Sequence, residues 1–309
     1  MNIVVLETLL GMQALEELGN VTFYDHTGYE QIVERTRDAE IVIINKCRMD
    51  ASILAQLPRL KYIGILATGY NVVDLEAATR QGITVTNVPE YSTDSVAQMV
   101  WAHILNIVNR TGFYSHENRL GRWCRNRDFY YLEQPYMELA GKQMGIVGLG
   151  NIGMAVARIA QAFNMNVVAF TSKKEPGPGI RSVSLDELFS TSDIVSLHCP
   201  LTPSTEGMVD AARIRTMKPT AILINTGRGP LVNEHDLAEA LKSGRIAAYG
   251  ADVLSTEPAK SDNPLVPLPN CHLTPHIAWA SAESQKRLVG ICIDNVRSFL
   301  AGNTRNKVN

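Results

Sequence analysis

Short apolar runs alternate with amphipathic stretches along the first third of the chain. The runs are Ile3–Leu6, Val21–Tyr24, Ile41–Asn45, Tyr62–Leu66 and Thr84–Asn87. A stretch between them, Asp74–Gln81, has the apolar spacing of a helix, and the turn residue Gly82 follows it. Such alternation is typical of a parallel sheet covered by helices.

A second series of the same kind begins near the middle of the chain. Its apolar runs are Met144–Val147, Asn166–Phe170, Ile194–His198, Ala221–Asn225, Tyr249–Val253 and His272–Thr274. The helical patterns between them are Ile152–Phe163, Leu185–Leu188, Ala211–Met217 and Glu234–Ser243. The pattern predicts a second doubly wound parallel sheet.

The two series are joined by a helical pattern from Ser92 to Asn109 and a final one from Ser281 to Leu300. The stretch Gly112–Pro135 shows no periodicity, and its length indicates a functional or interface role. We therefore predict two doubly wound α/β domains that face each other across a cleft. One comprises residues 1–96 and 284–309, and the other, residues 97–283, is inserted into it.

Composition narrows the class of protein. Among 309 residues, 45% are apolar and 19% are charged, which is ordinary for a globular protein. The net charge of −2 and the pI near 6.4 give no electrostatic footprint for nucleic acid or an anionic membrane. No segment resembles a membrane span or a signal peptide, and the five scattered cysteines suit a reducing compartment. We expect a cytoplasmic protein.

A glycine-rich motif follows directly after the first run of the second series. Residues 148–153 read Gly-Leu-Gly-Asn-Ile-Gly, the G-x-G-x-x-G fingerprint between a predicted strand and a predicted helix. The first glycine allows a tight turn, the second lets the backbone approach a pyrophosphate, and the third lets the helix pack closely. This context predicts a Rossmann domain that binds NAD(P). The expected cofactor contacts in the motif are Gly148, Gly150, Asn151, Ile152 and Gly153.

Polar residues follow the other predicted strands of this domain. In a doubly wound sheet, ligands bind outside the carboxyl ends of the strands, so these residues are the candidates for contact with the cofactor. They are Thr171, Ser172 and Lys173, then His198, Cys199 and Pro200, then Thr226 and Gly227, and finally Asp252. Asp252 is interpreted as an acceptor for a nicotinamide carboxamide, or alternatively as a cap of its strand.

Three residues in the same strand-end positions suit acid–base chemistry on a ketone that lies next to a carboxylate. Arg228, between two glycines, is placed to hold a carboxylate bidentately, although most arginines are simply exposed. His276 suits proton donation near pH 7, whereas a lone histidine is more often structural. Glu257 either pairs with His276 or is a solvated loop residue. A zinc site at His272 and His276 is disfavoured because Pro275 prevents the helix that the spacing requires, and we expect no metal.

The ribose-binding position departs from the usual pattern. NAD-selective proteins place an acid about 20 residues after the glycine motif, and here Thr171 occupies that place. Threonine does not repel a 2′-phosphate, and Lys173 and Lys174 add positive charge, unless they only form a solvated turn. The sequence thus favours NADP(H) slightly over NAD(H).

Taken together, the motifs resemble those of the D-isomer-specific 2-hydroxyacid dehydrogenases over essentially the whole chain. The resemblance rests on the glycine motif, on residues 198–202, 225–229, 250–253 and 257–258, and on Thr274-Pro275-His276-Ile277-Ala278. It implies a nucleotide-binding domain inserted into a flavodoxin-like catalytic domain. It also implies Arg228, Glu257 and His276 as catalytic residues.

The resemblance further implies a substrate loop at residues 67–71, with Thr68, Gly69 and Tyr70 binding the carboxylate together with Arg228 and His276. Thr93 and Ala278 would join the residues that bind the cofactor, and the region around Trp123 would form a homodimer interface. The short connection after Leu6 departs from the family's pattern and leaves the support of the substrate loop open.

Within the family, residues 91–96 and 276–280 are most similar to those of glycerate dehydrogenases, also called hydroxypyruvate reductases. The expected reaction is hydride transfer between NAD(P)H and a small 2-oxo acid that gives a D-2-hydroxy acid. Glyoxylate is an alternative substrate. An alternative of another class is a nicotinamide-sensing corepressor of the same fold.

Overall fold

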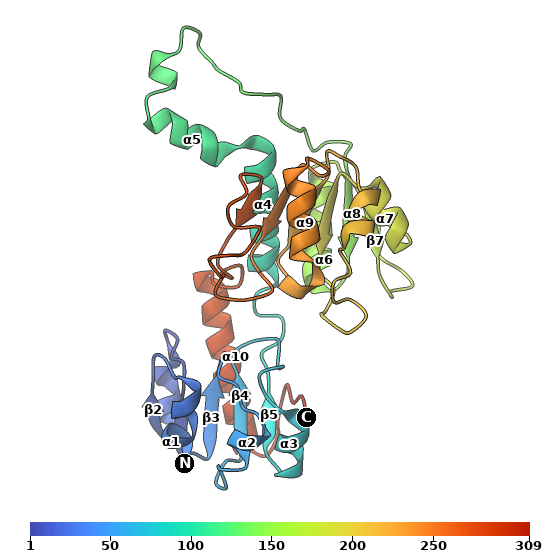
Figure 1. Cartoon of the computed structure of the whole chain (residues 1–309). Helices are drawn as coiled ribbons and strands as arrows, with labels where there is room; N and C mark the ends of the chain where they lie inside the picture. The colour runs from blue at the N-terminus through green and yellow to red at the C-terminus, as the bar shows by residue number, and fades with distance from the viewer. The chain divides into compact units, whose positions relative to one another are not determined.

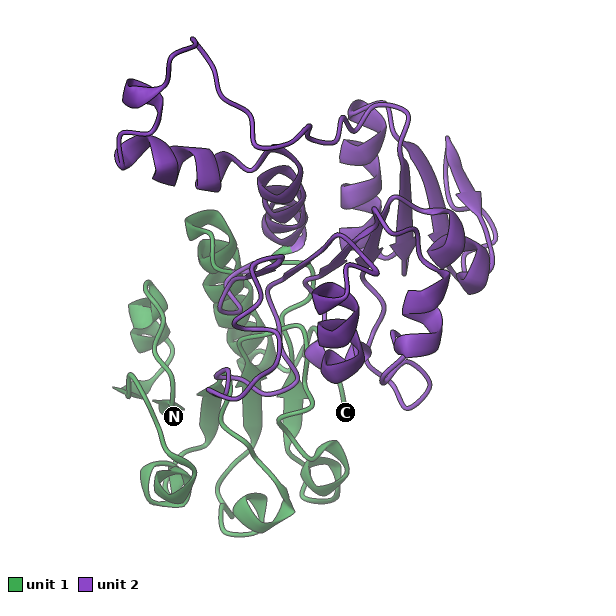
Figure 2. Ribbon diagram, turned by 45° about the horizontal axis from the view of Figure 1, so that its top comes forward, with its two compact units in different colours: residues 1–92, 280–309 green, residues 93–279 purple.

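The chain, described over all residues 1–309 by a computed structural model, divides into two compact units (Figure 2). Unit 1 comprises Met1–Ser92 and Ala280–Asn309, and unit 2 comprises Thr93–Trp279. Each unit is built on one parallel sheet, so the predicted α/β class is confirmed. No helix is both long enough and apolar enough to cross a membrane.

The sheet of unit 1 has five parallel strands in the order β2-β1-β3-β4-β5, which is the flavodoxin-like order. The strands are β1 (Asn2–Val5), β2 (Asn20–Phe23), β3 (Ile41–Ile44), β4 (Tyr62–Ile65) and β5 (Thr84–Thr86). Every residue of β3 and β4 is buried, because helices cover both faces of the sheet. Their continuous apolar runs follow from this burial.

Short helices and one long helix cover this sheet (Figure 1). They are the 3₁₀ helices η1 (Met12–Glu17) and η2 (Tyr29–Gln31), and the α-helices α1 (Ile32–Thr36), α2 (Ala51–Leu54), α3 (Leu75–Arg80) and α10 (Ala282–Leu300). The carboxylates of Asp50 and Asp74 accept backbone N–H bonds at the starts of α2 and α3, which is how N-caps define a helix start. Helix α10 packs on β4 and η1 and ties the last residues of the chain to unit 1.

The sheet of unit 2 has seven parallel strands in the order β12-β11-β10-β9-β6-β7-β8. The strands are β6 (Gln143–Val147), β7 (Asn166–Phe170), β8 (Ile180–Ser182), β9 (Ile194–Leu197), β10 (Ile222–Asn225), β11 (Ala248–Ala251) and β12 (Cys271–Leu273). The chain order reverses at β6, which lies between β7 and β9. Ligands of doubly wound sheets bind at this point.

Two sets of helices cover the two faces of the larger sheet. Helices α4 (Thr93–Asn109) and α6 (Asn151–Ala162) pack on each other and form one core with β6 and its neighbours. Helices α7 (Leu185–Thr191), α8 (Ala211–Thr216) and α9 (Glu234–Lys242) bury a second core on the opposite face. A 3₁₀ turn, η4 (Gly229–Leu231), follows β10.

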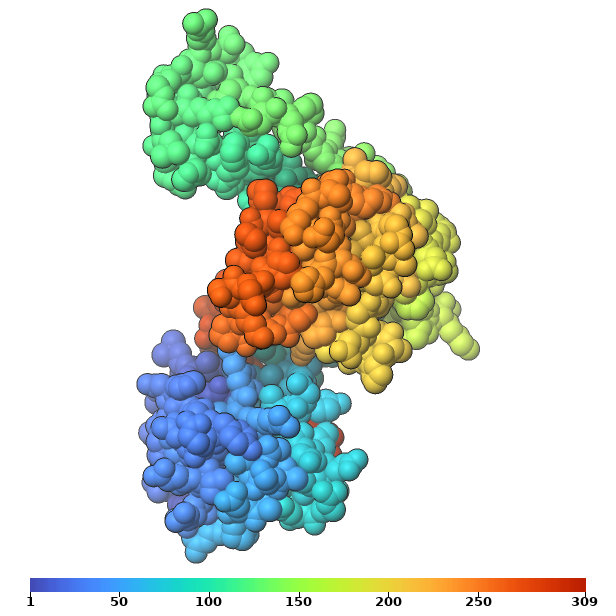
Figure 3. Space-filling model, in the orientation of Figure 1, coloured from blue at the N-terminus to red at the C-terminus, as the bar shows by residue number.

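The stretch Gly112–Pro135 was expected to be irregular, and that expectation is partly wrong. It contains most of α5 (Thr111–Arg119) and the 3₁₀ turn η3 (Trp123–Arg125). Neither helix buries a residue, so neither shows an apolar stripe in the sequence. We call residues 111–136 the arm, and Figure 3 shows that it projects from the rest of unit 2.

Candidate active site

The glycine loop lies between β6 and α6, where the strand order reverses. Gly148 has φ +94°, and a Cβ atom there would lie 2.7 Å from Cys199 N and 2.8 Å from the carbonyl oxygen of His198. The loop therefore touches the end of β9, and only glycine fits. Gly150 is the N-cap residue of α6 and offers no side chain to the helix, so the N-terminal N–H groups suit phosphate oxygens. The donor set thus fits a dinucleotide.

Gly153, the third glycine of the motif, is buried in the first turn of α6, and its contact with the cofactor stays a prediction. A Cβ atom there would collide with the carbonyl oxygen of Gly148 and lie 3.2 Å from Cγ2 of Ile146. Gly153 therefore faces the glycine loop and β6, and it acts by letting α6 pack closely on them. Asn151 and Ile152, which begin the helix and are not buried, stay predicted contacts of the cofactor.

Thr171 lies beside this loop at the end of β7. The Gly148 N–H donates to the carbonyl oxygen of Phe170 at 2.9 Å, which fixes the next residue near the motif. The Thr171 hydroxyl accepts the Lys173 N–H at 3.2 Å and closes a short turn. Ser172, Lys173 and Lys174 are exposed on this turn. The place of the usual ribose-binding acid therefore offers a hydroxyl and two cations.

The end of β9 contributes neutral side chains. Nε2 of His198 lies 2.8 Å from the Ser196 hydroxyl, and burial lowers the pKa of His198 to about 4. Burial also raises the pKa of the Cys199 thiol, whose sulfur lies 3.7 Å from that of Met208. Pro200 is exposed after them. Near neutral pH, Cys199 is consequently a protonated thiol rather than a nucleophile.

A side-chain clamp shapes the loop that carries Arg228. The Asn225 amide accepts the Gly227 N–H at 3.0 Å and donates to the carbonyl oxygen of Arg228 at 2.9 Å. The guanidinium is exposed and donates to the Gly227 carbonyl at 2.8 Å. At Gly229 a Cβ would collide with the carbonyl carbon of Leu254. This close approach brings the Arg228 loop against the segment that leads to Glu257.

Glu257 and His276, predicted as possible partners, are hydrogen-bonded in the structure. Glu257 Oε2 lies 2.6 Å from His276 Nδ1, and Oε1 accepts the Leu254 N–H at 3.0 Å. Partial burial of Glu257 works to raise its pKa. The hydrogen bonds from His276 and Leu254, with the charges of His276 and Arg228, outweigh burial and lower the pKa below the usual value. The pair is thus an imidazole held by an ionised carboxylate, with Nε2 left for proton exchange.

Asp252 is 1% exposed and organises the backbone around His276. Its carboxylate accepts the Thr274 hydroxyl at 2.6 Å and the N–H groups of Ile277 and Ala278 at 2.9 and 2.7 Å. The His276 N–H donates to the Asp252 carbonyl at 2.9 Å, and His276 has φ +55°. A non-glycine residue in this region needs such support. Asp252 therefore acts as a cap at the end of its strand. Its contact with a nicotinamide carboxamide stays a prediction.

The remaining predicted residues lie in both units. Thr93 begins α4, and the Ala278 carbonyl oxygen accepts the Ser95 hydroxyl at 2.7 Å. Thr226, after β10, is buried. Within unit 1, the Thr68 hydroxyl donates to the Val88 carbonyl at 3.0 Å, whereas Tyr70 is 44% exposed. The backbone of the predicted substrate loop is thus anchored at Thr68, with Tyr70 free to meet a ligand.

Glu7, which follows the first strand of unit 1, was not among the predicted site residues. Its Oε2 atom accepts the N–H groups of Asn45, Lys46 and Cys47 at 2.8, 2.5 and 3.1 Å. Because β1 and β3 are neighbours, one carboxylate holds the loop after β3 in place. These three hydrogen bonds tie the short connection after Leu6 to the loop after β3. An acid directly after an apolar run was the only available signal.

The comparison with protein-family models decides the family. The NAD binding domain of D-isomer specific 2-hydroxyacid dehydrogenase matches residues 101–278, more than half of the chain. The chain belongs to the D-isomer specific 2-hydroxyacid dehydrogenases. NAD(P) is accordingly the cofactor class of this dehydrogenase.

Two curated relatives are similar to this dehydrogenase over nearly its whole length. A hydroxypyruvate reductase of Blautia hydrogenotrophica is 45% identical to this chain, and the alignment covers 97% of this chain and 95% of the reductase. A glycerate dehydrogenase of Methylorubrum extorquens is 42% identical, and the alignment covers 90% of this chain and 88% of that dehydrogenase. A crystal structure of the TT0316 protein from Thermus thermophilus matches with a TM-score of 0.92 and 35% identity over 100% of both chains.

Substitution of two glycines in the loop of this dehydrogenase separates folding from cofactor binding. We expect Gly148→Ala to lower the melting temperature, because the new Cβ meets the backbone of β9 and the positive φ adds about 1–2 kcal/mol of strain. Gly150→Ala meets no atom within 4 Å and should keep its melting temperature. It should nevertheless weaken NAD(P)H binding about tenfold or more, because the methyl group takes the place of a close pyrophosphate.

Thermal unfolding and a fluorescence titration with NADH and NADPH measure the two effects. Unchanged affinity in a folded Gly150→Ala protein would contradict the assignment of this loop to the pyrophosphate.

Proposed function

We propose that this protein reduces a small 2-oxo acid, hydroxypyruvate above others, to the D-2-hydroxy acid with NAD(P)H. The observation that carries the proposal is the Glu257–His276 pair, hydrogen-bonded at 2.6 Å in the same unit as the glycine loop. The names of the two curated relatives, a hydroxypyruvate reductase and a glycerate dehydrogenase, support this choice of substrate. Unit 2 then binds the dinucleotide, and unit 1 carries the substrate loop.

His276 acts as the general acid in this reaction. When bound, the reduced nicotinamide supplies the hydride that is added to C2 of the 2-oxo acid. The carbonyl oxygen then needs a proton, and His276 donates it from Nε2 because Nδ1 is engaged with Glu257. The carboxylate of Glu257 stabilises the imidazolium before the transfer and fixes the orientation of the ring. In the reverse direction the same pair removes the hydroxyl proton.

Arg228 orients the substrate. Its guanidinium is exposed, and its backbone is fixed on both sides by the Asn225 amide and by the close contact at Gly229. Arginine binds a carboxylate through two parallel hydrogen bonds, which aligns the adjacent carbonyl group. Its charge also stabilises the negative charge that develops on the carbonyl oxygen during hydride addition. In unit 1, Thr68, Gly69 and Tyr70 stay the predicted substrate loop.

Initial rates test the reaction directly. Hydroxypyruvate, glyoxylate, pyruvate and phosphohydroxypyruvate are each offered with NADH and with NADPH, and oxidation of the cofactor is followed by absorbance. The proposal requires the highest kcat/KM for hydroxypyruvate. Preference for glyoxylate would change the substrate but keep the reaction, whereas no turnover with any acid would favour the corepressor alternative.

Replacement of the general acid should abolish turnover but keep cofactor binding. We expect His276→Gln to lower kcat by about 10²–10⁴-fold, the usual contribution of a positioned acid. The affinity for NAD(P)H, measured by fluorescence, should stay within about threefold. His235→Gln, an exposed histidine on α9, is the matched control and should keep full activity. A loss below about tenfold in His276→Gln would remove His276 from this role.

For the cofactor, we propose a preference for NADP(H). Thr171 stands where an acid would repel the 2′-phosphate, and the exposed Lys173 and Lys174 follow it on the same turn. A solved structure with a TM-score of 0.90 and 31% identity over all of both chains is an acyclic imino acid reductase in complex with NADPH. A protein of this fold therefore binds the phosphorylated cofactor.

An acid at this position should reverse the preference. We expect Thr171→Asp to lower the ratio of kcat/KM for NADPH to kcat/KM for NADH by about tenfold or more, equivalent to about 1.4 kcal/mol. The carboxylate would repel the 2′-phosphate and accept the ribose hydroxyls instead. Ser190→Asp on α7 adds the same charge away from the turn and should leave the ratio unchanged. An unchanged ratio in Thr171→Asp would place the ribose elsewhere.

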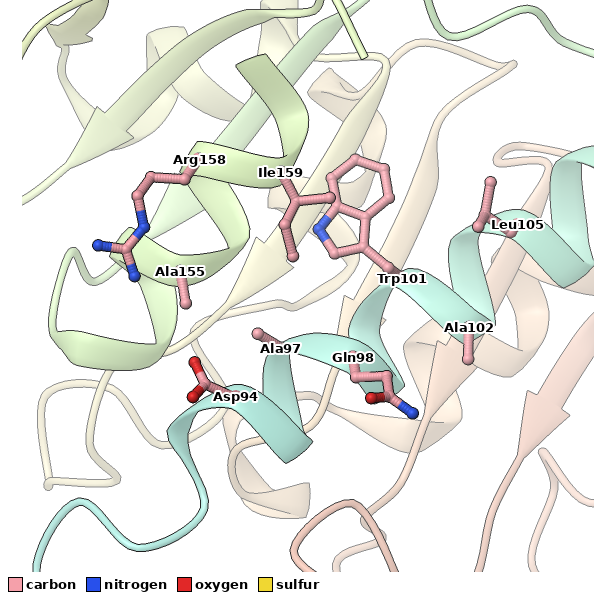
Figure 4. Close-up of a pocket in the computed structure, with 9 residues that line it drawn as sticks. All are labelled: Asp94, Ala97, Gln98, Trp101, Ala102, Leu105, Ala155, Arg158 and Ile159. Atoms are coloured by element: carbon pink, nitrogen blue, oxygen red, sulfur yellow. The ribbon is translucent and has the colours of Figure 1, made fainter. Parts of the chain in front are cut away.

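We also propose a homodimer in which the arm of one copy covers unit 2 of another. The arm exposes large apolar and aromatic side chains: Leu120, Trp123, Phe129, Tyr130, Leu132 and Tyr136. A groove of about 630 Å³ lies between α4 and α6 and is lined mainly by apolar residues such as Ala97, Trp101 and Ile159. Figure 4 shows the side chains that line it. Exposed apolar surfaces of this kind mark protein interfaces.

The remaining prediction, a cytoplasmic location, rests on composition alone.

Removal of aromatic side chains from the arm should dissociate this dimer. We expect Trp123→Ala/Phe129→Ala to shift the sedimentation mass from twice 34.0 kDa to 34.0 kDa at micromolar concentration. Aromatic residues contribute most of the energy of such interfaces. Leu10→Ala removes an 88% exposed leucine of unit 1 and should leave the mass unchanged. A monomeric parent protein would contradict the proposed assembly.

A further inference from the structure

A chain of hydrogen bonds connects helix α4 to the backbone that carries His276. His103, on α4, is 5% exposed, and its Nε2 atom lies 3.1 Å from the Thr274 hydroxyl. That hydroxyl lies 2.6 Å from Oδ1 of Asp252, and the same carboxylate accepts the N–H groups of Ile277 and Ala278. None of the roles assigned so far explains why a histidine is buried at position 103.

The number of hydrogen atoms that each group can donate determines the direction of these hydrogen bonds. The carboxylate of Asp252 accepts, so the single hydroxyl hydrogen of Thr274 is donated to it. The Thr274 oxygen is then an acceptor towards His103, and Nε2 of His103 must carry a hydrogen. Burial lowers the pKa of His103, while the charge of Asp252 opposes the shift and that of His272 adds to it. The ring is therefore the neutral Nε2–H tautomer near pH 7.

Packing alone does not hold this corner of unit 2. A cavity of about 400 Å³ lies between α4 and β12, and its lining includes His103, Asn106, His272 and Thr274. Side chains beside such a space have room to change rotamer, because dense contacts on one side are missing. The hydrogen bond from His103, together with the one that Thr274 donates to Asp252, therefore restrains the rotamer of Thr274.

We propose that His103 is a positioning residue for proton transfer by His276. It orients the Thr274 hydroxyl towards Asp252, and Asp252 in turn holds the backbone just after His276. The φ of +55° at His276 needs this support, since an unrestrained residue leaves that region. The inference rests on the proposed reaction, because it concerns how the proton donor is aimed.

Three variants at position 103 test the positioning role. His103→Leu removes the donor, and we expect kcat to fall by about tenfold or more, towards the ~10²-fold that a misplacement of 1 Å costs. KM for NAD(P)H should stay within about threefold. His103→Gln places an amide N–H where Nε2–H was and should restore kcat to within about threefold of the parent protein. His103→Asn places its amide near Nδ1 instead and should resemble His103→Leu.

Thr274, the next residue in the series of hydrogen bonds, provides an independent check. Thr274→Val keeps the shape of the side chain but removes the hydroxyl, and it should lower kcat to a similar degree. If His103 acts through Thr274, the double variant His103→Leu/Thr274→Val should be no slower than Thr274→Val. Multiplicative losses would show that the two residues act separately and would overturn the proposal.

A measurement without turnover separates this inference from the proposed reaction. Nitrogen-15 NMR of the histidine rings should show His103, assigned by its loss in His103→Gln, as the Nε2–H tautomer near pH 7. In Thr274→Val this preference should disappear. If the parent protein reduces none of the four acids, the proposed reaction fails, whatever the tautomer.

If the parent protein is active, two results overturn the role of His103. One is full kcat in a folded His103→Leu protein. The other is an equal loss of kcat in His103→Leu and His103→Gln with equally lowered melting temperatures, which would indicate a purely structural residue. An Nδ1–H tautomer in the parent protein would likewise contradict the donor role.

Discussion

The geometry of the candidate site depends on the buried carboxylate of Asp252. Removal of a charge from water is costly unless hydrogen bonds replace the lost solvation, and here one hydroxyl and two N–H groups do so. The groups that solvate the carboxylate belong to the residues on both sides of His276. Satisfying the buried charge therefore also fixes the backbone around His276, and the bond to Glu257 then orients the His276 ring.

Close approaches of the backbone have the same effect elsewhere in unit 2. Gly148 lets the glycine loop touch the end of β9, Gly153 lets α6 pack on that loop, and Gly229 lets the Arg228 loop touch the segment before Glu257. The contacts at Gly148 and Gly229 each join strand ends that are far apart in the sequence. Arg228, Glu257 and His276 thus come from three different loops, but they interact electrostatically at one edge of the sheet.

Much of this arrangement is readable from the sequence, because local patterns report local structure. The G-x-G-x-x-G motif after an apolar run indicated the turn between β6 and α6, and the apolar runs located most strands to within one or two residues. The missed elements were those without an apolar signal. Strand β8 is mostly exposed, α5 buries no residue, and α1 and α2 are too short to show a helical period.

Spacing along the chain is enough to indicate the α/β class, the dinucleotide motif and the residue types available for acid–base chemistry. Which of those residues meet depends on how the chain folds, and the structure shows it. It paired Glu257 with His276, gave Asp252 the role of a cap, and placed His103 behind Thr274. A hydrogen bond needs two atoms within about 3 Å, and residues 171 positions apart in the chain reach that distance only after the sheet and α4 have packed.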